Sequence, residues 1–305
     1  MTVSTENVTL PQVSIGDIEV SADGLDIAKA AEIYKEYGCL VVRGLMKAHV
    51  EEMSREINMV IQESLDQVEQ ATKNALGWST PNGTIWLPAP ENFDREMQIM
   101  CLPISYKNSS AFTRAAMNPT TLDIVEAVLG PNLELFDTGQ ALVKEAVGGH
   151  PKVLHQDAAY FEHRFEGPMA QLNYVVDTDL NNGCLHVVPG SFKLGVLRHE
   201  DTFSHLGLDE KEWPWERSVP IEGKAGDAIF FHVKCIHGSK PNWSDKARPV
   251  YICRYRDADD YVIIGATTVE SRAEAEKHIK KAKNENERNM MVRGFRKFDA
   301  ARQQD

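Results

Sequence analysis

Hydrophobic residues in the first part of the chain recur at spacings of three and four, which is typical of helices with one apolar face. The pattern predicts a helix over residues 27–37, because Asp26 can cap its first turn and Gly38 can end it. A longer helical pattern runs from about residue 47 to residue 76. Both segments therefore present one apolar face to a core.

Other signals mark a strand, a loop and a further helix. The run CLVVRGL, residues 39–45, is apolar and β-branched, and predicts a buried strand. Residues 77–90 are rich in Gly, Pro, Asn and Trp, and are predicted to form a loop. Asn118 can cap a helix, Pro119 suits its first turn, and Gly130 ends it.

From Leu133 onward the pattern changes to short apolar runs separated by turn residues, and this predicts a sandwich, jelly roll or barrel. No linker composition separates the parts, so we expect one domain. It has a helical N-terminal part (about 26–130), a β core (about 133–265) and a charged helical tail (about 269–305). The runs expected to be strands are LELF, QALVKEA, QLNYVVD, CLHVVPG, AIFFHV, PVYICRY and YVIIG.

Composition and charge narrow the classes of function. The chain has 305 residues and a net charge of −12, which argues against binding nucleic acid or an anionic membrane surface. Five cysteines without a CxxC pair indicate thiols in a reducing compartment. We see no signal peptide and no apolar run of membrane-spanning length. A cytoplasmic location follows as an expectation.

A short motif supplies the first candidate chemistry. In His155-Gln156-Asp157, residues two apart would share one face of a strand and could grip one ion. His237 follows just past the strand DAIFFHV. Two imidazoles and one carboxylate on one face of an octahedron form the facial triad of non-haem Fe(II) oxygenases, which leaves positions for a co-substrate and O2.

The residues after His237 add a carboxylate site. Arg248 lies eleven residues later, and its guanidinium suits the distal carboxylate of 2-oxoglutarate, to which Ser239 could add a hydroxyl. His232 is the rival third ligand, but its place inside an apolar strand indicates a packed imidazole. Arg254 and Arg256 would share a face with Arg248, where they would meet an acidic substrate or pair with surface carboxylates.

These motifs resemble the phytanoyl-CoA dioxygenase family of Fe(II)/2-oxoglutarate-dependent oxygenases. The likeness is strongest over about residues 133–257. It rests on HQDAAYF, NNGCLHVVPGSFK, KAGDAIFFH and IHGSKPN, with Arg248 after them. It implies a double-stranded β-helix, a cupin-like jelly roll packed by N-terminal helices. One departure is small, because Phe192 stands where the family has a histidine that is not an iron ligand.

The resemblance also implies roles for individual residues. His155, Asp157 and His237 match the iron ligands, and Arg248 and Ser239 match the binders of the distal 2-oxoglutarate carboxylate. Two further residues, Gln140 and Asn173, match positions that line the co-substrate site. At Asn173 an alternative alignment is shifted by one residue.

The expected function is that of a 2-oxoglutarate-dependent dioxygenase that oxidises a small-molecule metabolite, secondary metabolites included. The presence of Asp157 favours hydroxylation over halogenation, because halogenating relatives replace this carboxylate with a small residue. Expected partners are Fe(II), 2-oxoglutarate, O2, ascorbate as an activator in vitro, and a second copy of the chain. The net charge does not favour a highly anionic substrate. Two alternatives remain, namely a cupin-like metal enzyme without 2-oxoglutarate and a non-catalytic binding protein.

Overall fold

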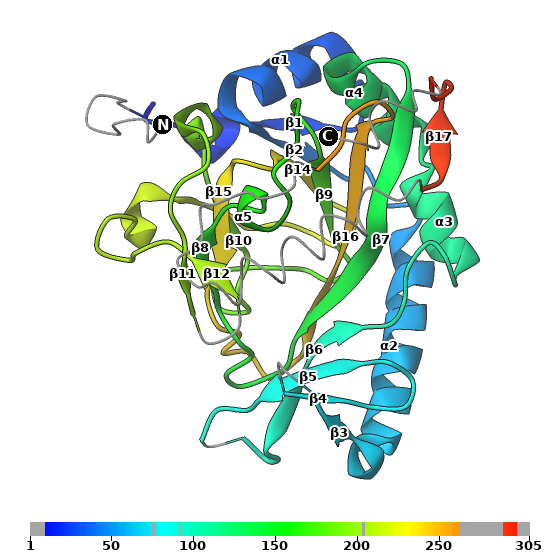
Figure 1. The fold of residues 1–305 in the computed structure, drawn as a ribbon, viewed down its shortest axis with the longest axis vertical. Helices are drawn as coiled ribbons and strands as arrows, with labels where there is room; N and C mark the ends of the chain where they lie inside the picture. Colours follow the sequence, from blue (N-terminus) through cyan, green and yellow to red (C-terminus); the bar gives the residue numbers. More distant parts are fainter. Residues whose placement is uncertain (1–9, 75–76, 92, 203–204, 263–288, 298–305) are drawn as a thin grey trace.

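Two β-sheets face each other, and helices cover the outer face of the larger sheet (Figure 1). The computed structural model describes residues 10–74, 77–91, 93–202, 205–262 and 289–297. In this part of the chain the arrangement is a jelly roll with helices packed on one side. The predicted fold class, mainly β with flanking N-terminal helices, is confirmed.

The larger sheet has the strand order β1-β2-β14-β9-β16-β7-β6-β5-β4-β3, and β17 pairs with β7. All of its pairings are antiparallel except β1 with β2. The strands are β1 (Glu19–Ser21), β2 (Cys39–Arg43), β3 (Thr72–Lys73), β4 (Trp78–Ser79), β5 (Ile85–Pro88), β6 (Met97–Leu102), β7 (Leu133–Lys144), β9 (Met169–Tyr174), β14 (Ala228–His232), β16 (Arg248–Asp257) and β17 (Met291–Arg293).

The smaller sheet has the order β13-β10-β15-β8, and a separate hairpin pairs β11 with β12. These strands are β8 (Lys152–His155), β10 (Leu185–Val188), β11 (Glu200–Asp201), β12 (Leu206–Gly207), β13 (Val219–Ile221) and β15 (Ile236–Ser239). The helices are α1 (Ile27–Tyr37), α2 (Val50–Asp66), α3 (Ser110–Ala116), α4 (Pro119–Leu129) and α5 (Ala158–Phe161). Short 3₁₀ turns are η2 (Ile15–Asp17), η3 (Val68–Gln70), η4 (Ser191–Leu194) and η5 (Trp215–Arg217).

The central strands are apolar throughout because both of their faces are buried. In β2, Cys39 and Val41 belong to the core between the two sheets. Leu40 and Val42 point the other way, into the core shared with the helices. Since side chains alternate along a strand, a continuous apolar run is what a strand covered on both faces requires.

Helix α1 forms as predicted, because both of its ends carry local signals. The side chain of Asp26 accepts hydrogen bonds from the backbone N–H groups of Ala28 and Lys29 at 2.9 and 3.2 Å. Gly38 ends the helix in the left-handed conformation at φ 69°, which favours glycine. Asn118 likewise caps α4 by accepting from the N–H of Thr121.

Two predictions for the N-terminal part are wrong. The helix expected over residues 47–76 is shorter, since α2 ends at Asp66 and the chain continues into η3 and β3. The loop expected over residues 77–90 contains β4 and β5, which extend the larger sheet. Strands of two to four residues at a sheet edge are too short to show a period of two in the sequence.

The later part of the chain also differs from expectation. The runs LELF and QALVKEA form one long strand, β7, rather than two. The run YVIIG forms no strand over its described residues, where Val262 makes an isolated bridge to His163. Most of the tail expected to be helical lies outside the described residues. Its described portion, 289–297, contains the strand β17 and no helix.

Candidate metal and co-substrate site

Two strands of the smaller sheet bring His155 and His237 together. His155 is the last residue of β8 and pairs in register with His237 of β15. Their ring centroids lie 4.3 Å apart. The sequence placed His237 just past the strand that precedes it, whereas it lies inside a strand of its own. Antiparallel pairing, rather than nearness along the chain, therefore creates the pair.

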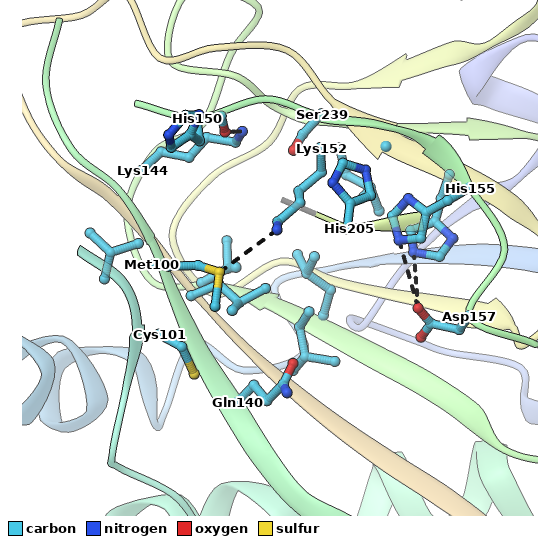
Figure 2. Close-up of a pocket in the computed structure, with 18 of the residues that line it drawn as sticks. Met100, Cys101, Gln140, Lys144, His150, Lys152, His155, Asp157, His205 and Ser239 are labelled. Carbon is cyan, nitrogen blue, oxygen red and sulfur yellow. Dashed lines mark hydrogen bonds and ion pairs between the residues drawn. The ribbon is translucent and has the colours of Figure 1, made fainter. Parts of the chain in front are cut away.

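Asp157 reaches the two histidines through a turn. The predicted reason, a shared strand face, is wrong, because β8 ends at His155 and Asp157 has φ −60° and ψ −27° at the start of α5. Its Oδ1 nevertheless lies 3.8 Å from Nε2 of His155 and 3.7 Å from Nε2 of His237. The candidate ligand atoms of the three buried residues lie within 4.8 Å of one another, and Figure 2 shows His155 above Asp157.

Hydrogen bonds to the backbone fix the tautomer of both histidines. Nδ1 of His155 lies 2.8 Å from the carbonyl oxygen of Val153, and Nδ1 of His237 lies 2.9 Å from that of Cys235. Because a carbonyl only accepts, each Nδ1 must carry the proton, which leaves a lone pair on each Nε2. Burial lowers the pKa of both imidazoles, so both stay neutral, as metal ligands must.

Arg254 holds the other oxygen of the same carboxylate. Its Nε and Nη2 donate to Oδ2 of Asp157 at 3.2 and 3.0 Å, and its guanidinium lies over the ring of Phe161. Both partners are buried. This grip turns Oδ1 towards the two Nε2 atoms. The sequence predicted that Arg254 would contact an acidic substrate or pair with a surface carboxylate, whereas it pairs with the buried Asp157.

Gln156 anchors the turn between the first two candidate ligands. It is fully buried, and its side-chain amide donates to the carbonyls of Gly195 and Lys234 at 2.9 and 2.7 Å. Its Oε1 accepts from the N–H of Leu197, and its own N–H donates to Nε2 of His199 at 2.9 Å. No local pattern predicts this role, because each partner is distant along the chain.

Arg248 and Ser239 line the same cavity as the histidines and Asp157. Arg248 begins β16 and is buried, and burial lowers its pKa. Its Nη2 donates to the carbonyl of Gly183 and its Nε to that of Asn182. Gly183 has φ 80°, a conformation that favours glycine, so a turn at these two residues presents both carbonyls to the arginine. Ser239 ends β15, two residues after His237.

Of the two further residues predicted at the co-substrate site, one lines the cavity and the other does not. Gln140 of β7 lines the cavity. Asn173 does not, which corrects the prediction. Its side chain donates to the carbonyl of Tyr251 and accepts from Gln171, on the opposite face of β9. Leu172 lines the cavity instead, so the predicted register was wrong by one residue.

The cavity has a volume of about 280 Å³ and lies between the two sheets. Trp86 and Tyr106 do not line this cavity, because they belong to the core shared with the helices. Neighbouring side chains of β5 and β6 face the cavity instead. Its further lining residues are Ile85, Leu87, Ile99, Met100, Cys101, Leu142, Val143, Lys144, His150, Lys152, Tyr160, Phe161, Leu185, His205, Phe231, Gly238, Val250, Ile252 and Arg254.

Two residues that the sequence offered for other roles, His232 as a metal ligand and Arg256 as a substrate contact, have structural partners instead. His232 lies at the end of β14, where its Nε2 is 3.0 Å from Oε2 of Glu166 and its Nδ1 accepts from the N–H of Lys234. Arg256 is buried against Glu134, with Nε donating to Oε1 at 2.7 Å. Neither belongs to the cluster at the cavity.

The donor set fits a divalent transition metal with open coordination positions. Two neutral imidazoles and one carboxylate converge, and each is oriented by a further hydrogen bond, which is how metal ligands are normally held. A buried guanidinium and a hydroxyl line the same cavity and suit a carboxylate. Among the described residues no helix is long and apolar enough to cross a membrane.

Comparison with known proteins agrees with this geometry. A profile of the phytanoyl-CoA dioxygenase family matches residues 34–250. The peroxisomal phytanoyl-CoA dioxygenase of Bos taurus is 25% identical over 256 residues, which is 79% of this chain and 72% of that protein. The probable alpha-ketoglutarate-dependent hypophosphite dioxygenase of Stutzerimonas stutzeri is 24% identical over 209 residues, 66% of this chain and 72% of that one.

A solved structure supports the fold. The epimerase SnoN, in complex with Fe3+, alpha ketoglutarate and nogalamycin RO, has a TM-score of 0.55 to this chain at 22% identity. The match covers 77% of this chain and 85% of SnoN. At this identity the likeness concerns the jelly roll alone.

Proposed function

The chain belongs to the phytanoyl-CoA dioxygenase family of Fe(II)/2-oxoglutarate-dependent oxygenases, and from this premise we propose that it hydroxylates a small-molecule metabolite, with release of succinate and CO2. The observation that carries the proposal is the buried cluster of His155, Asp157 and His237, whose candidate ligand atoms lie within 4.8 Å of one another.

The proposed roles follow from the geometry of each side chain. His155 and His237 offer Nε2, and Asp157 offers Oδ1, to Fe(II). The chemistry that Fe(II) and 2-oxoglutarate supply together is the activation of O2, coupled to the oxidation of 2-oxoglutarate to succinate and CO2. Arg248 and Ser239 bind the distal carboxylate of the co-substrate, and Gln140 contacts it from β7.

The protein's own contribution is orientation and the exclusion of water. The backbone carbonyls of Val153 and Cys235 keep both imidazoles in the tautomer that binds metal. Arg254 keeps the carboxylate of Asp157 turned inward. The surrounding apolar side chains exclude bulk water, which strengthens each of these electrostatic contacts.

The size of the cavity supports a small substrate. Its volume of about 280 Å³ must hold the co-substrate together with the reacting part of the substrate. Ligand pockets for drug-sized molecules range from about 300 to 1,000 Å³. By name, one relative acts on hypophosphite and another on phytanoyl-CoA, so relatives differ widely in substrate size. We infer that the oxidised carbon lies in a short molecule or at the tip of a longer one.

The test is binding of the co-substrate, followed by turnover. Under argon, Fe(II) and 2-oxoglutarate should give the metal-to-ligand charge-transfer absorption of their chelate on the protein. In air with ascorbate, slow uncoupled succinate formation should follow. His155→Ala should abolish both signals, whereas His232→Ala, a buried histidine outside the cavity, should retain them. A wild-type protein without the absorption, or an active His155→Ala variant, would overturn the proposal.

We also infer a cytoplasmic location and a homodimer. None of the five cysteines forms a disulfide, and four of them are buried, which suits a reducing compartment. Cell fractionation tests the location, and light scattering on the purified chain tests the dimer.

A further inference from the structure

A bulge in the larger sheet turns Met100 into the cavity. Ile85 of β5 pairs with Cys101 of β6, whereas the next residue, Trp86, pairs with Ile99. Met100 is therefore the additional residue of β6, and such a bulge bends the strand and redirects its side chains. Ile99, Met100 and Cys101 all line the cavity, where a regular strand would present only every second residue.

A second bulge, in the smaller sheet, places Lys152 beside the same cavity. His237 of β15 pairs with His155 of β8, but Ser239, two residues later, pairs with Lys152, three residues earlier. The additional residue in β8 puts Lys152 on the same face as His155, although their spacing is odd. Ser239 and Lys152 are direct cross-strand partners, and both line the cavity.

The side chains of Met100 and Lys152 meet between the two sheets. Nζ of Lys152 donates to Sδ of Met100 at 3.8 Å, and Figure 2 shows the two side chains pointing towards each other. Because β6 belongs to the larger sheet and β8 to the smaller one, this contact crosses the cavity from one wall to the other. Met100 therefore fills cavity space that a shorter side chain would leave open.

Within the larger sheet, Met100 lies at the same level as Arg248. Arg248 of β16 pairs with Lys144 of β7. The N–H of Ile99 donates to Oε2 of Glu145, the residue after Lys144, at 2.6 Å. Since neighbouring strands lie about 4.8 Å apart, β6 is about 10 Å from β16 at this level. Met100 and Arg248 both have long side chains that line the cavity, so they border the same part of it.

Met100 thus lies next to the place assigned to the distal carboxylate of 2-oxoglutarate. Arg248 and Ser239 are the residues proposed to bind that carboxylate, and the partner of Ser239, Lys152, contacts Met100. The thioether of Met100 has no hydrogen to donate to a carboxylate, and its side chain is apolar. What Met100 contributes there is bulk, which limits how far an acid can extend beyond Arg248 and Ser239.

We propose that Met100 sets the chain length of the 2-oxo acid, so that the site accepts 2-oxoglutarate and rejects 2-oxoadipate, which has one more CH2 group. This inference rests on the proposed function, because it concerns the co-substrate of the same site. The additional CH2 group would move the distal carboxylate past Arg248 and Ser239, into the space that Met100 fills. Forcing one additional methylene into a packed site lowers affinity about 5- to 150-fold.

The test compares the two acids on the full-length protein loaded with Fe(II) under argon. Each acid is titrated separately, and the charge-transfer absorption of its chelate gives the affinity. Wild type should bind 2-oxoglutarate about 5- to 150-fold more tightly than 2-oxoadipate. Met100→Ala removes Cγ, Sδ and Cε, which leaves room for the additional CH2 group, and should bring the two affinities within about threefold of each other.

Three variants serve as controls. Met100→Leu keeps a similar volume and should retain most of the preference for 2-oxoglutarate. Met100→Val repeats the shortening with a residue that favours strands, and should reduce the preference at least about threefold even if the alanine variant is unstable. Met97→Ala removes the same atoms from the same strand, but Met97 belongs to the core shared with the helices, so the preference should not change. Urea denaturation compares the stability of all variants.

Three results would overturn the proposal. Equal affinities of wild type for the two acids would remove its basis. A folded Met100→Ala or Met100→Val variant with the preference of wild type would mean that another group limits the chain length. Equal losses of preference in Met97→Ala and Met100→Ala would attribute the effect to general loosening of β6. Each of these results leaves the proposed function intact if 2-oxoglutarate gives the absorption, whereas a wild-type protein without it for either acid would overturn the proposed function as well.

Discussion

Replacing Arg254 with lysine isolates the orientation of Asp157 from its charge environment. The lysine keeps the positive charge beside the carboxylate, so repulsion of the metal changes little. It loses the planar fork, in which Nε and Nη2 lie 3.2 and 3.0 Å from Oδ2 of Asp157. We expect Oδ1 to lose its fixed direction towards His155 and His237, and metal affinity to fall.

The structure sets the size of the effect. Both partners are buried, with side-chain exposures of 6% for Arg254 and 8% for Asp157, so solvent screens the pair little. Loss of one of two hydrogen bonds to a charged group costs about 1.5–3 kcal/mol of folding free energy. Removing a group that orients a metal ligand typically weakens metal binding about 10- to 100-fold.

A second arginine on the same strand offers a matched control. Arg256 lies two residues after Arg254, is equally buried, pairs with Glu134 and covers the ring of Phe136 as Arg254 covers Phe161. Arg256→Lys should therefore reduce the free energy of unfolding by a similar amount and leave metal affinity unchanged. Calorimetric titration with Mn(II), as an air-stable substitute for Fe(II), measures affinity, and urea denaturation measures stability.

Two results would refute this reasoning. An Arg254→Lys variant that binds Mn(II) as tightly as wild type would mean that the fork does not orient Asp157. Equal losses of affinity in Arg254→Lys and Arg256→Lys would attribute the effect to general loosening of β16 rather than to the carboxylate.

Three further predictions concern binding and stability. Arg248→Gln should weaken 2-oxoglutarate binding about tenfold or more with little change in Mn(II) affinity, as measured by calorimetry, because it removes a charge-assisted fork. Burial lowers the pKa of His163 to about 3, below its unfolded value of about 6.5, so its unfolded form binds the extra proton and stability falls as pH drops through this window. Between pH 7 and 5 the loss is about 2 kcal/mol, and His163→Gln should remove that share of the slope in urea denaturation. Asp26→Ala should cost about 1 kcal/mol of unfolding free energy by removing the cap of α1, and Asp26→Asn, which can still accept, should restore most of it.

Local signals explain why some elements could be predicted from the sequence and others could not. Helix α1 has its cap and its left-handed glycine within the segment itself, at Asp26 and Gly38, so both ends were found. The strands buried on both faces, such as β2, were found because burial demands an unbroken apolar run. Strands β4 and β5 are stabilised by pairing with β6, a partner that the sequence of residues 77–90 does not contain.

The same distinction applies to the candidate site. His155 and Asp157 were identified from a strand geometry that does not occur, yet they converge, because a turn into α5 brings the carboxylate back to the imidazole. The motif therefore identified residues that do converge, although the shared strand face expected to bring them together is absent. At Asn173 the alternation along β9 decides which side chain faces the cavity, and a shift of one residue exchanged it for Leu172.

The position of Lys152 in the cavity could not be predicted from the sequence. Counted along a regular strand, it lies on the opposite face from His155, and only the bulge in β8 turns it into the cavity. The net charge of −12 likewise argued against an anionic substrate, because it averages over the whole surface. A substrate experiences the field of the few groups that line the cavity, where cations outnumber Asp157.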